Sequence, residues 1–373
     1  MKIRTVTFHR AHNHGSVLQA YALQTCVTNF FKQKGIECDY KIIDYFRKVQ
    51  KELYSIIKSD LSLKGVVKNC IALRHYNSLA LRHKRFNTFV EKYLNLTLRF
   101  DSEQSLRTAP PEGDIFISGS DQIWNVRAKD ASTVYYLDFP TNGAKKISIA
   151  ASFGPLSIEW GNFDKKLYSN LLNDYSEISV REDESALNVE RLIGSVPTIL
   201  ADPTFLLNQD EWAKIESSDT RLSHPYILLY DLEPTKQQLN LVTKISKILD
   251  LPVVVLRFNN KNDWFNSFEK HYDAGPQEFL SYIKNAELVL TSSFHGTAFS
   301  IIYQKQFFVL DGKKDARISS ILRKCGLMSQ CIDSNDNTTL NIEVTTPKFD
   351  EALHFISQNL TSLNCFLEKI LER

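Results

Sequence analysis

The sequence predicts an α/β fold in which two doubly wound, Rossmann-like domains face a cleft. Its 373 residues are too many for one ordinary core, and short apolar runs alternate with helical stretches in both halves. A polar segment at 208–225, which ends in a proline, separates the halves. We therefore predict an N-terminal domain over 1–215, a C-terminal domain over 216–347, and an amphipathic helix over 348–373 that can pack back on the N-terminal domain.

The first half opens with a βαβ pattern. A strand at 2–8 precedes a helix from Ser16 to about Lys34, and Gly35 ends that helix before a strand at 37–44. This order favours parallel strands. Further strands are predicted at 114–118, 146–152, 177–181 and 198–202.

A basic segment at 47–99 interrupts this alternation. It holds twelve lysines and arginines and three acids, has no proline, and places apolar residues at helical spacings. We expect two or three basic helices, inserted in the first domain at about 46–110. They are either solvated faces or a docking surface for anionic lipid headgroups, in which Arg82, Lys84 and Arg85 would take part.

The second half repeats the α/β alternation. Its predicted strands are 226–232, 252–258, 288–293 and 307–311, and its predicted helices are 234–249, 276–285 and one from about Thr297. In an open α/β sheet, ligands bind at the carboxyl ends of the strands, so the loops after the strands are where functional groups are expected.

Composition narrows the class of protein. A hydrophobic content of 43% and a charged content of 24% are typical of a globular protein, and a net charge of +2 argues against a nucleic-acid binder. The N-terminus lacks the apolar core of a signal peptide, and no apolar run reaches the length of a membrane span. Six scattered cysteines predict reduced thiols and a cytoplasmic location.

The loop after the first strand, HRAHNHG at 9–15, is a candidate ligand loop. Its glycine permits a tight turn, and the amides of the following helix favour an anion. Histidines without a nearby carboxylate or thiol make a metal site the weaker interpretation, and a solvated loop is also open. The residues assigned to an acceptor or anion site are His12, Asn13, His14, Gly15 and Ser16 of this loop, with Ser120 of a later loop.

Two other loops of the first half carry candidate groups. Ser120 and Asp121 follow the strand at 114–118, and Asp121 could either accept hydrogen bonds from a sugar hydroxyl or cap the next turn. Arg181 closes the strand at 177–181, where it forms a structural salt bridge or a fork for phosphate or carboxylate. Asp202, before a proline, indicates a turn.

In the second half, the stretch TSSFHGTAFS at 291–300 holds the strongest candidate. His295 lies at an expected strand–helix turn, which favours a catalytic role over a buried structural histidine. Gly296 and the amide end of a helix at Thr297 could hold an anion. Arg317 is either a further anion contact or a solvated residue of the next helix.

Five motifs resemble those of the polysaccharide pyruvyl transferase family, in the family's order and over about residues 6 to 327. They are NHGSVLQAYALQ (13–24), SGSDQIWN (118–125), ISVRED (178–183), ADPTFLL (201–207) and SSFHGTAFSIIYQKQF (292–307). The resemblance implies a GT-B-like fold, phosphoenolpyruvate as donor, a sugar of a cell-surface glycan as acceptor, and a pyruvate ketal as product.

The resemblance also suggests roles for single residues. The family's histidine falls on His295 and its strand-end arginine on Arg181, whereas many members carry an arginine at the position of Ser293. The implied scheme makes His295 and Asp121 catalytic, with Arg181, Gly296, Thr297 and Arg317 around the donor, and needs neither a metal nor a cofactor. Two alternatives stay open: a GT-B glycosyltransferase that uses a nucleotide sugar, and a non-catalytic glycan-binding relative.

Overall fold

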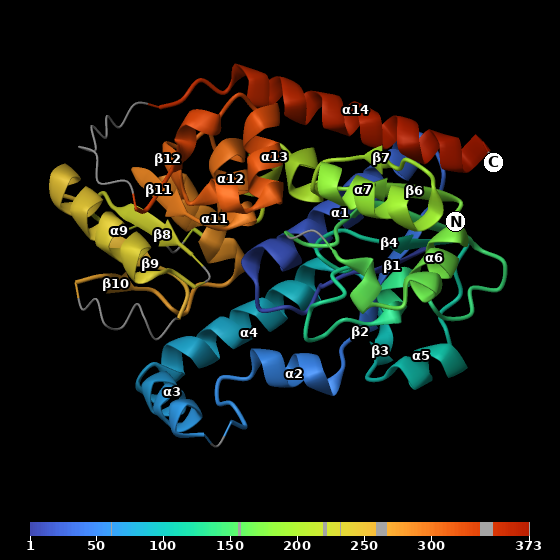
Figure 1. Cartoon of the computed structure of the whole chain (residues 1–373), viewed down its shortest axis with the longest axis horizontal. Coiled ribbons are helices and arrows are strands. Elements are labelled where there is room, and N and C mark those ends of the chain that lie inside the picture. Colours follow the sequence, from blue (N-terminus) through green and yellow to red (C-terminus); the bar gives the residue numbers. More distant parts are fainter. Residues whose placement is uncertain are drawn as a thin grey trace. The chain divides into compact units, whose positions relative to one another are not determined.

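The computed structural model describes residues 1–60, 62–155, 158–218, 222–231, 233–258, 267–335 and 346–372 (Figure 1). They form two compact units, each built around its own parallel sheet. Unit 1 comprises Met1–Tyr54, Val90–Leu207 and Ile356–Arg373, and unit 2 comprises Ser55–Phe89 and Asn208–Phe355. The predicted α/β class with two doubly wound sheets is confirmed.

Unit 1 contains a seven-stranded sheet in the order β3-β2-β1-β4-β5-β6-β7. The strands are β1 (Lys2–Val6), β2 (Asp39–Tyr45), β3 (Leu96–Phe100), β4 (Ile115–Ser118), β5 (Lys145–Ala151), β6 (Glu177–Val180) and β7 (Thr198–Ile199). Strand β1 pairs in parallel with both β2 and β4. Because the chain builds outward from β1 in both directions, the topological switch point lies between β1 and β4.

Helices cover this sheet and connect its strands. They are α1 (His14–Gln33), α2 (Lys48–Tyr54), α5 (Glu103–Thr108), α6 (Lys165–Asn173) and α7 (Asp183–Ile193), with short 3-10 turns at Thr133–Tyr136, Trp160–Asn162 and Pro203–Leu206. The last helix, α14 (Asp350–Glu372), is anchored within unit 1 through its carboxyl-terminal part. Lys145 Nζ donates to Ile370 O at 2.8 Å, and Lys34 pairs with Glu368 at 2.5 Å.

Unit 2 contains a six-stranded sheet in the order β10-β9-β8-β11-β12-β13. The strands are β8 (Ile227–Tyr230), β9 (Val253–Val255), β10 (Glu269–Lys270), β11 (Leu288–Thr291), β12 (Phe307–Leu310) and β13 (Cys331–Ile332). Its helices are α3 (Leu63–Arg74), α4 (Tyr76–Tyr93), α8 (Gln209–Ala213), α9 (Lys236–Leu249), α11 (Pro276–Asn285), α12 (Phe294–Ile302) and α13 (Ala316–Lys324), and the last four residues of α4 count with unit 1. The switch point of this sheet lies between β8 and β11.

The basic segment differs from its prediction in two ways. Strand β3, at the edge of the unit 1 sheet, was predicted as part of the basic helices, although its run LTLRF alternates apolar and polar residues as a strand does. Residues 55–89 also belong to unit 2 and not to the first domain, since Ala72 and Leu79 pack in the core of unit 2.

Two of the three basic residues predicted to face lipid are turned inward. Arg82 is 6% exposed, and its Nη1 donates to Leu256 O at 3.1 Å. Arg85 forms ion pairs with Asp273 at 2.6 Å and with Glu278 at 3.2 Å. These arginines join α4 to unit 2, so the prediction that they form a lipid contact is wrong. Lys84, in contrast, is exposed.

Candidate functional site

The switch point of unit 1 brings together the two candidate loops that follow β1 and β4. Ser16, in the first turn of α1, donates from Oγ to Asp121 Oδ2 at 2.5 Å. Asp121 has a left-handed backbone with φ of 71°, and its Oδ1 also accepts from the amide of Gln122 at 2.8 Å. A non-glycine residue held in this conformation costs free energy, which is typical of functional loops.

Most other predicted residues of these loops have structural contacts. Helix α1 begins at His14, two residues before the predicted start, and Asn13 caps it by accepting from the amide of Gly15 at 3.1 Å. His14 is fully buried, and His12 stacks on Tyr54 with ring centroids 5.5 Å apart. Ser120 is also buried, and it donates from Oγ to Ala150 O at 2.8 Å. Ser16 is therefore the member of the loop that reaches Asp121.

Arg181 lies directly after β6 among carboxylates. Its Nη1 is 2.7 Å from Asp202 Oδ2 and 3.8 Å from Asp121 Oδ1, and its Nε is 3.1 Å from Glu182 Oε2. Its side chain is only 2% exposed. Burial would lower the pKa of Arg181, but attraction to the three carboxylates outweighs it and raises the pKa above its usual value. This geometry favours the salt-bridge alternative over a fork for the donor.

A second buried ion cluster surrounds a single carboxylate on β2. Asp44 accepts from His9 Nε2 at 3.1 Å and from Arg10 Nε at 2.5 Å, and Arg99 Nε lies 3.3 Å away. Burial would raise the pKa of Asp44, but the hydrogen bonds from His9 and Arg10 hold it well below its usual range. The first histidine of the HRAHNHG loop thus fixes the loop to the sheet.

In unit 2, His295 lies within helix α12 and not in the turn before it. The helix begins at Phe294, so the predicted start at Thr297 is wrong. The reason is that Ser293, in an extended conformation, is the N-cap, and its carbonyl accepts from the amide of Thr297 at 3.0 Å. The Thr297 amide is thereby used inside the helix. His295, in the first turn, is 6% exposed and lies beside the switch point.

Gly296 is required by packing. A Cβ atom there would come 2.2 Å from Thr291 Oγ1 and 3.0 Å from Tyr230 Cδ1. Thr291 Oγ1 is itself fixed, because it donates to Tyr230 O at 2.5 Å and accepts from the amide of Ser293 at 3.0 Å. Close contact between α12 and the ends of β8 and β11 sets the position of His295.

Arg317 reaches the same region from α13. Its guanidinium forms a two-pronged ion pair with Asp315, with Nε at 3.0 Å and Nη2 at 2.5 Å from the carboxylate. It also lies 6.0 Å from the ring centroid of Phe294, whose ring packs edge-on at 5.3 Å from that of His295. Asp315 therefore neutralises part of the positive charge of Arg317, the residue that was predicted to contact the donor.

Sequence reasoning missed two strand-end groups. Asp231 follows β8 and accepts from the hydroxyl of Ser292, which follows β11. Arg257 comes two residues after the end of β9 and is half-buried. Burial and the nearby charge of Arg257 lower the pKa of Arg82 to about 10, which places two cations close together. The run VVVLR at 253–257 has the same form as ISVR at 178–181 and could have revealed Arg257.

A family model for polysaccharide pyruvyl transferases matches residues 13–314, which is most of the chain. The chain belongs to the polysaccharide pyruvyl transferase family. The resemblance drawn from the five motifs is thereby confirmed. A search of the curated proteins gave no match.

Solved structures place this family member among GT-B folds. A protein from Listeria monocytogenes, designated a UDP-N-acetylglucosamine 2-epimerase, is 11% identical with a TM-score of 0.52, over 98% of this chain and 90% of that one. The UDP-GlcNAc 2-epimerase of Methanocaldococcus jannaschii gives 14% identity and 0.48, over 96% and 93%, and the Escherichia coli heptosyltransferase WaaC gives 12% and 0.40, over 96% and 100%. The first of these, with a TM-score above 0.5, supports a likeness of fold alone.

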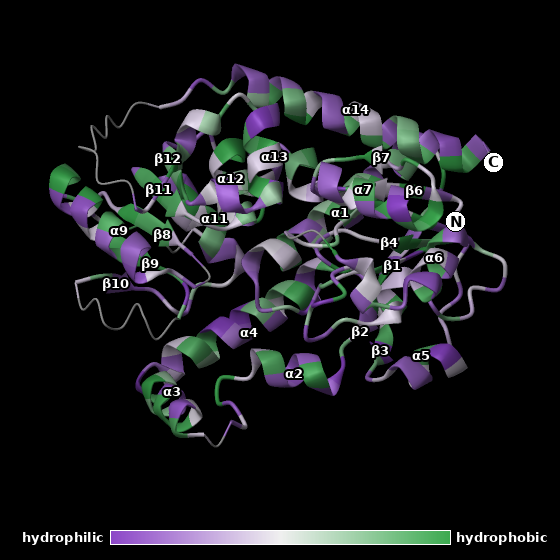
Figure 2. Ribbon diagram, viewed as in Figure 1, coloured by the Kyte–Doolittle hydropathy of each residue, from purple (hydrophilic) through white to green (hydrophobic). Residues whose placement is uncertain are grey.

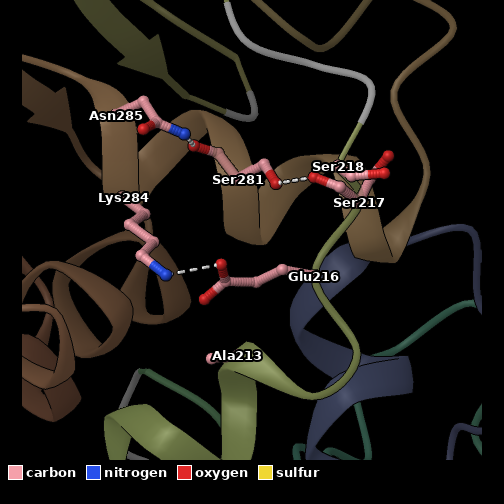
Figure 3. Close-up of a pocket in the computed structure, with 7 residues that line it drawn as sticks. All are labelled: Ala213, Glu216, Ser217, Ser218, Ser281, Lys284 and Asn285. Carbon is pink, nitrogen blue, oxygen red and sulfur yellow. Dashed lines mark hydrogen bonds and ion pairs between the residues drawn. The ribbon is translucent and has the colours of Figure 1, made fainter.

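One pocket of this family member, about 410 Å³, lies in unit 2 and is lined by the end of α8, the residues that follow it, and α11 (Figure 3). Lys284 points toward Glu216 across it, at 2.7 Å, and Tyr303 donates to the same carboxylate at 2.8 Å. Tyr303 caps the far end of the nine-residue helix α12, about 13 Å from the first turn at 1.5 Å per residue. The pocket therefore does not belong to the strand-end site.

Metal ligands are not clustered in the part of the chain that the structure describes. No group of three or more histidine, cysteine, aspartate or glutamate side chains there could hold a metal ion. The charged groups at the two switch points are instead paired with one another, as for Arg181 with Asp202 and Arg317 with Asp315.

Proposed function

We propose that the protein transfers the enolpyruvyl group of phosphoenolpyruvate to a sugar of a cell-surface polysaccharide, such as a capsule or exopolysaccharide, or to its lipid-linked precursor. The product is a pyruvate ketal, and phosphate is released. Family membership supports this assignment, and the observation that carries it is the place of His295, which lies within the matched residues and beside the switch point of unit 2.

The proposed reaction balances without a cofactor or metal. The methylene carbon of phosphoenolpyruvate takes one proton and becomes a methyl group, which leaves an electron-poor carbon C2. Two hydroxyls of the sugar form bonds to C2, and the bond from C2 to the phosphate oxygen breaks. Of the two hydroxyl protons, one balances the proton on the methyl group and the other leaves with phosphate.

His295 is the proposed proton-transfer group. An imidazole with a pKa near neutrality can both give and take a proton at physiological pH. Asp121 is proposed to orient or deprotonate the sugar hydroxyl. Its carboxylate is held by Ser16, and we propose that Arg181 positions Asp121 and Asp202, which revises the earlier assignment of Arg181 to the donor.

The donor carries a carboxylate and a phosphate, so its pocket needs cations or N–H groups. The cationic groups of unit 2 suit this need: Arg257 stands after β9 with Arg82 close by, and Arg317 adjoins Phe294. The amides in the first turn of α12, which include that of Gly296, would add donors. We propose that Arg257 supplies the cation that many family members place where Ser293 stands.

The test is turnover with defined substrates. The protein is incubated with phosphoenolpyruvate and a panel of aryl glycosides and lipid-linked sugars, and phosphate release is measured with the mass of the product. We expect phosphate release that depends on the acceptor, and a product heavier by one pyruvate minus water. Turnover of a nucleotide sugar in place of phosphoenolpyruvate would instead identify a glycosyltransferase. Glycan binding without any phosphate release would identify a non-catalytic relative.

A further inference from the structure

Helix α3 carries two apolar stripes on opposite sides. One stripe, with Gly65 and Ala72, is buried, and Ala72 packs in the core of unit 2. The other is exposed: the exposed fractions are 87% for Leu63, 46% for Val66 and 57% for Val67. A surface helix of a globular protein usually needs only the stripe that faces its core. Figure 2 shows strongly apolar and strongly polar residues side by side along α3.

The exposed residues form one continuous face. At 100° per residue, positions 63, 66, 67, 70 and 73 fall within a sector of about 120°. Leu73 is 57% exposed and Cys70 is also exposed, so this sector is apolar from Leu63 to Leu73, and Arg74, the last residue of the helix, also falls within it. We name this set, Leu63, Val66, Val67, Cys70 and Leu73, the α3 face.

Basic side chains flank the α3 face. Lys64, Lys68 and Arg74 are exposed, and residues 55–89 hold seven lysines and arginines but one acid, Asp60. Arg82 and Arg85 are used inside unit 2, so the charge available to a partner is concentrated on α3. Lysine and arginine can lay their apolar stems along a nonpolar surface while their charged ends contact anions.

We infer that the α3 face docks on a lipid bilayer with anionic headgroups. An apolar stripe flanked by lysines matches the acyl boundary and the phosphates of such a surface at the same time. A second copy of the chain fits less well, because two α3 faces would bring like charges together. A nucleic acid would pair with the lysines but not with Leu63 and Val67. The inference rests on α3 alone and does not depend on the proposed function.

The test is cosedimentation of the whole protein with vesicles. Vesicles of phosphatidylcholine with phosphatidylglycerol are compared with phosphatidylcholine alone, at low and high salt. We expect binding to the anionic vesicles that weakens with salt. A Lys64→Glu/Lys68→Glu variant should lose roughly thirtyfold in affinity, since each basic residue near the membrane contributes about a factor of five. A Leu63→Ser/Val67→Ser variant should lose about tenfold or more at either salt concentration.

Helix α9 supplies matched controls on the same unit. Lys244, Lys247 and Ile248 are exposed there, so Lys244→Glu/Lys247→Glu makes the same change in net charge and Ile248→Ser removes an exposed apolar side chain. Both controls should bind vesicles like the wild type, and circular dichroism should show that every variant is folded. Wild-type protein that stays in the supernatant at low salt would overturn the inference, as would equal losses in the α9 variants. A dimer that Leu63→Ser/Val67→Ser dissociates, without vesicle binding, would assign the face to a second copy.

Discussion

Replacing Arg181 by alanine should destabilise the fold. The substitution leaves Asp121, Glu182 and Asp202 together without their cation, and these carboxylates are 7%, 3% and 0% exposed. It removes two charge-assisted hydrogen bonds, at 2.7 Å and 3.1 Å, each worth about 1.5–3 kcal/mol. Breaking a buried ion pair on one side typically costs about 3–5 kcal/mol, which agrees with that sum. We therefore expect the free energy of unfolding to fall by about 3–5 kcal/mol.

Urea unfolding followed by circular dichroism measures this loss, and equilibrium binding of phosphoenolpyruvate measures the other possible effect. Arg257→Ala is the matched control, since it removes a half-buried strand-end arginine from unit 2. It should cost less stability than Arg181→Ala and weaken donor binding. An Arg181→Ala protein with wild-type stability but weak donor binding would refute the structural reasoning. That result would instead assign Arg181 to the donor site.

Three further outcomes follow from the same contacts. His295→Ala should lower kcat by about 10²–10⁴-fold in a protein that stays folded, and near-normal turnover would contradict a proton-transfer role. Gly296→Ala should destabilise by about 1–3 kcal/mol in urea unfolding, because Thr291 Oγ1 cannot move away; Gly161→Ala, where the added methyl group meets nothing within 4 Å, should cost far less. Asp44 has a lowered pKa, so its stabilisation is present above the unfolded pKa of about 3.9 and is lost as the pH falls below it. The stability gap between wild type and Asp44→Asn should therefore be largest near neutral pH and should begin to narrow only below about pH 4, as the pH approaches the lowered pKa of the folded state, and a constant gap would contradict the ion cluster.

Both parallel sheets could be predicted because their buried strands are short, continuous apolar runs separated by helical stretches. Strands β1, β4 and β11 lie where the sequence placed them, within a few residues at each end. Edge strand β3 was missed because its short run, although it alternates apolar and polar residues, directly follows a basic segment with helical spacings. Helical periodicity shows which face of a helix is buried but not which core it joins. The assignment of residues 55–89 to unit 2 therefore needed Ala72 and Leu79 in contact.

The sequence predicted which loops form the candidate site, but it did not predict what each residue does there. Ser16 and Asp121 are 105 residues apart, and their hydrogen bond follows from the adjacency of β1 and β4. Asn13 and Ser120 were grouped with an anion site because capping residues and ligand residues have the same chemistry. The hydrogen bond between the Gly15 amide and Asn13 is local, whereas Ser120 and Ala150 are 30 residues apart, and sequence alone distinguishes neither bond from a contact to a ligand.

The two strand-end arginines show that the charges around a residue must be taken from the structure and not from its local sequence. Arg181 and Arg257 each follow a buried apolar strand, so their local sequence patterns are equivalent. Arg181 meets three carboxylates, which leaves its surroundings negative, whereas Arg257 stands close enough to Arg82 to lower the pKa of that arginine. The proposed donor, which carries a carboxylate and a phosphate, would be repelled by the carboxylates around Arg181. For this reason the donor contacts are better sought at the carboxyl end of β9 than at that of β6, even though the family motif draws attention to Arg181.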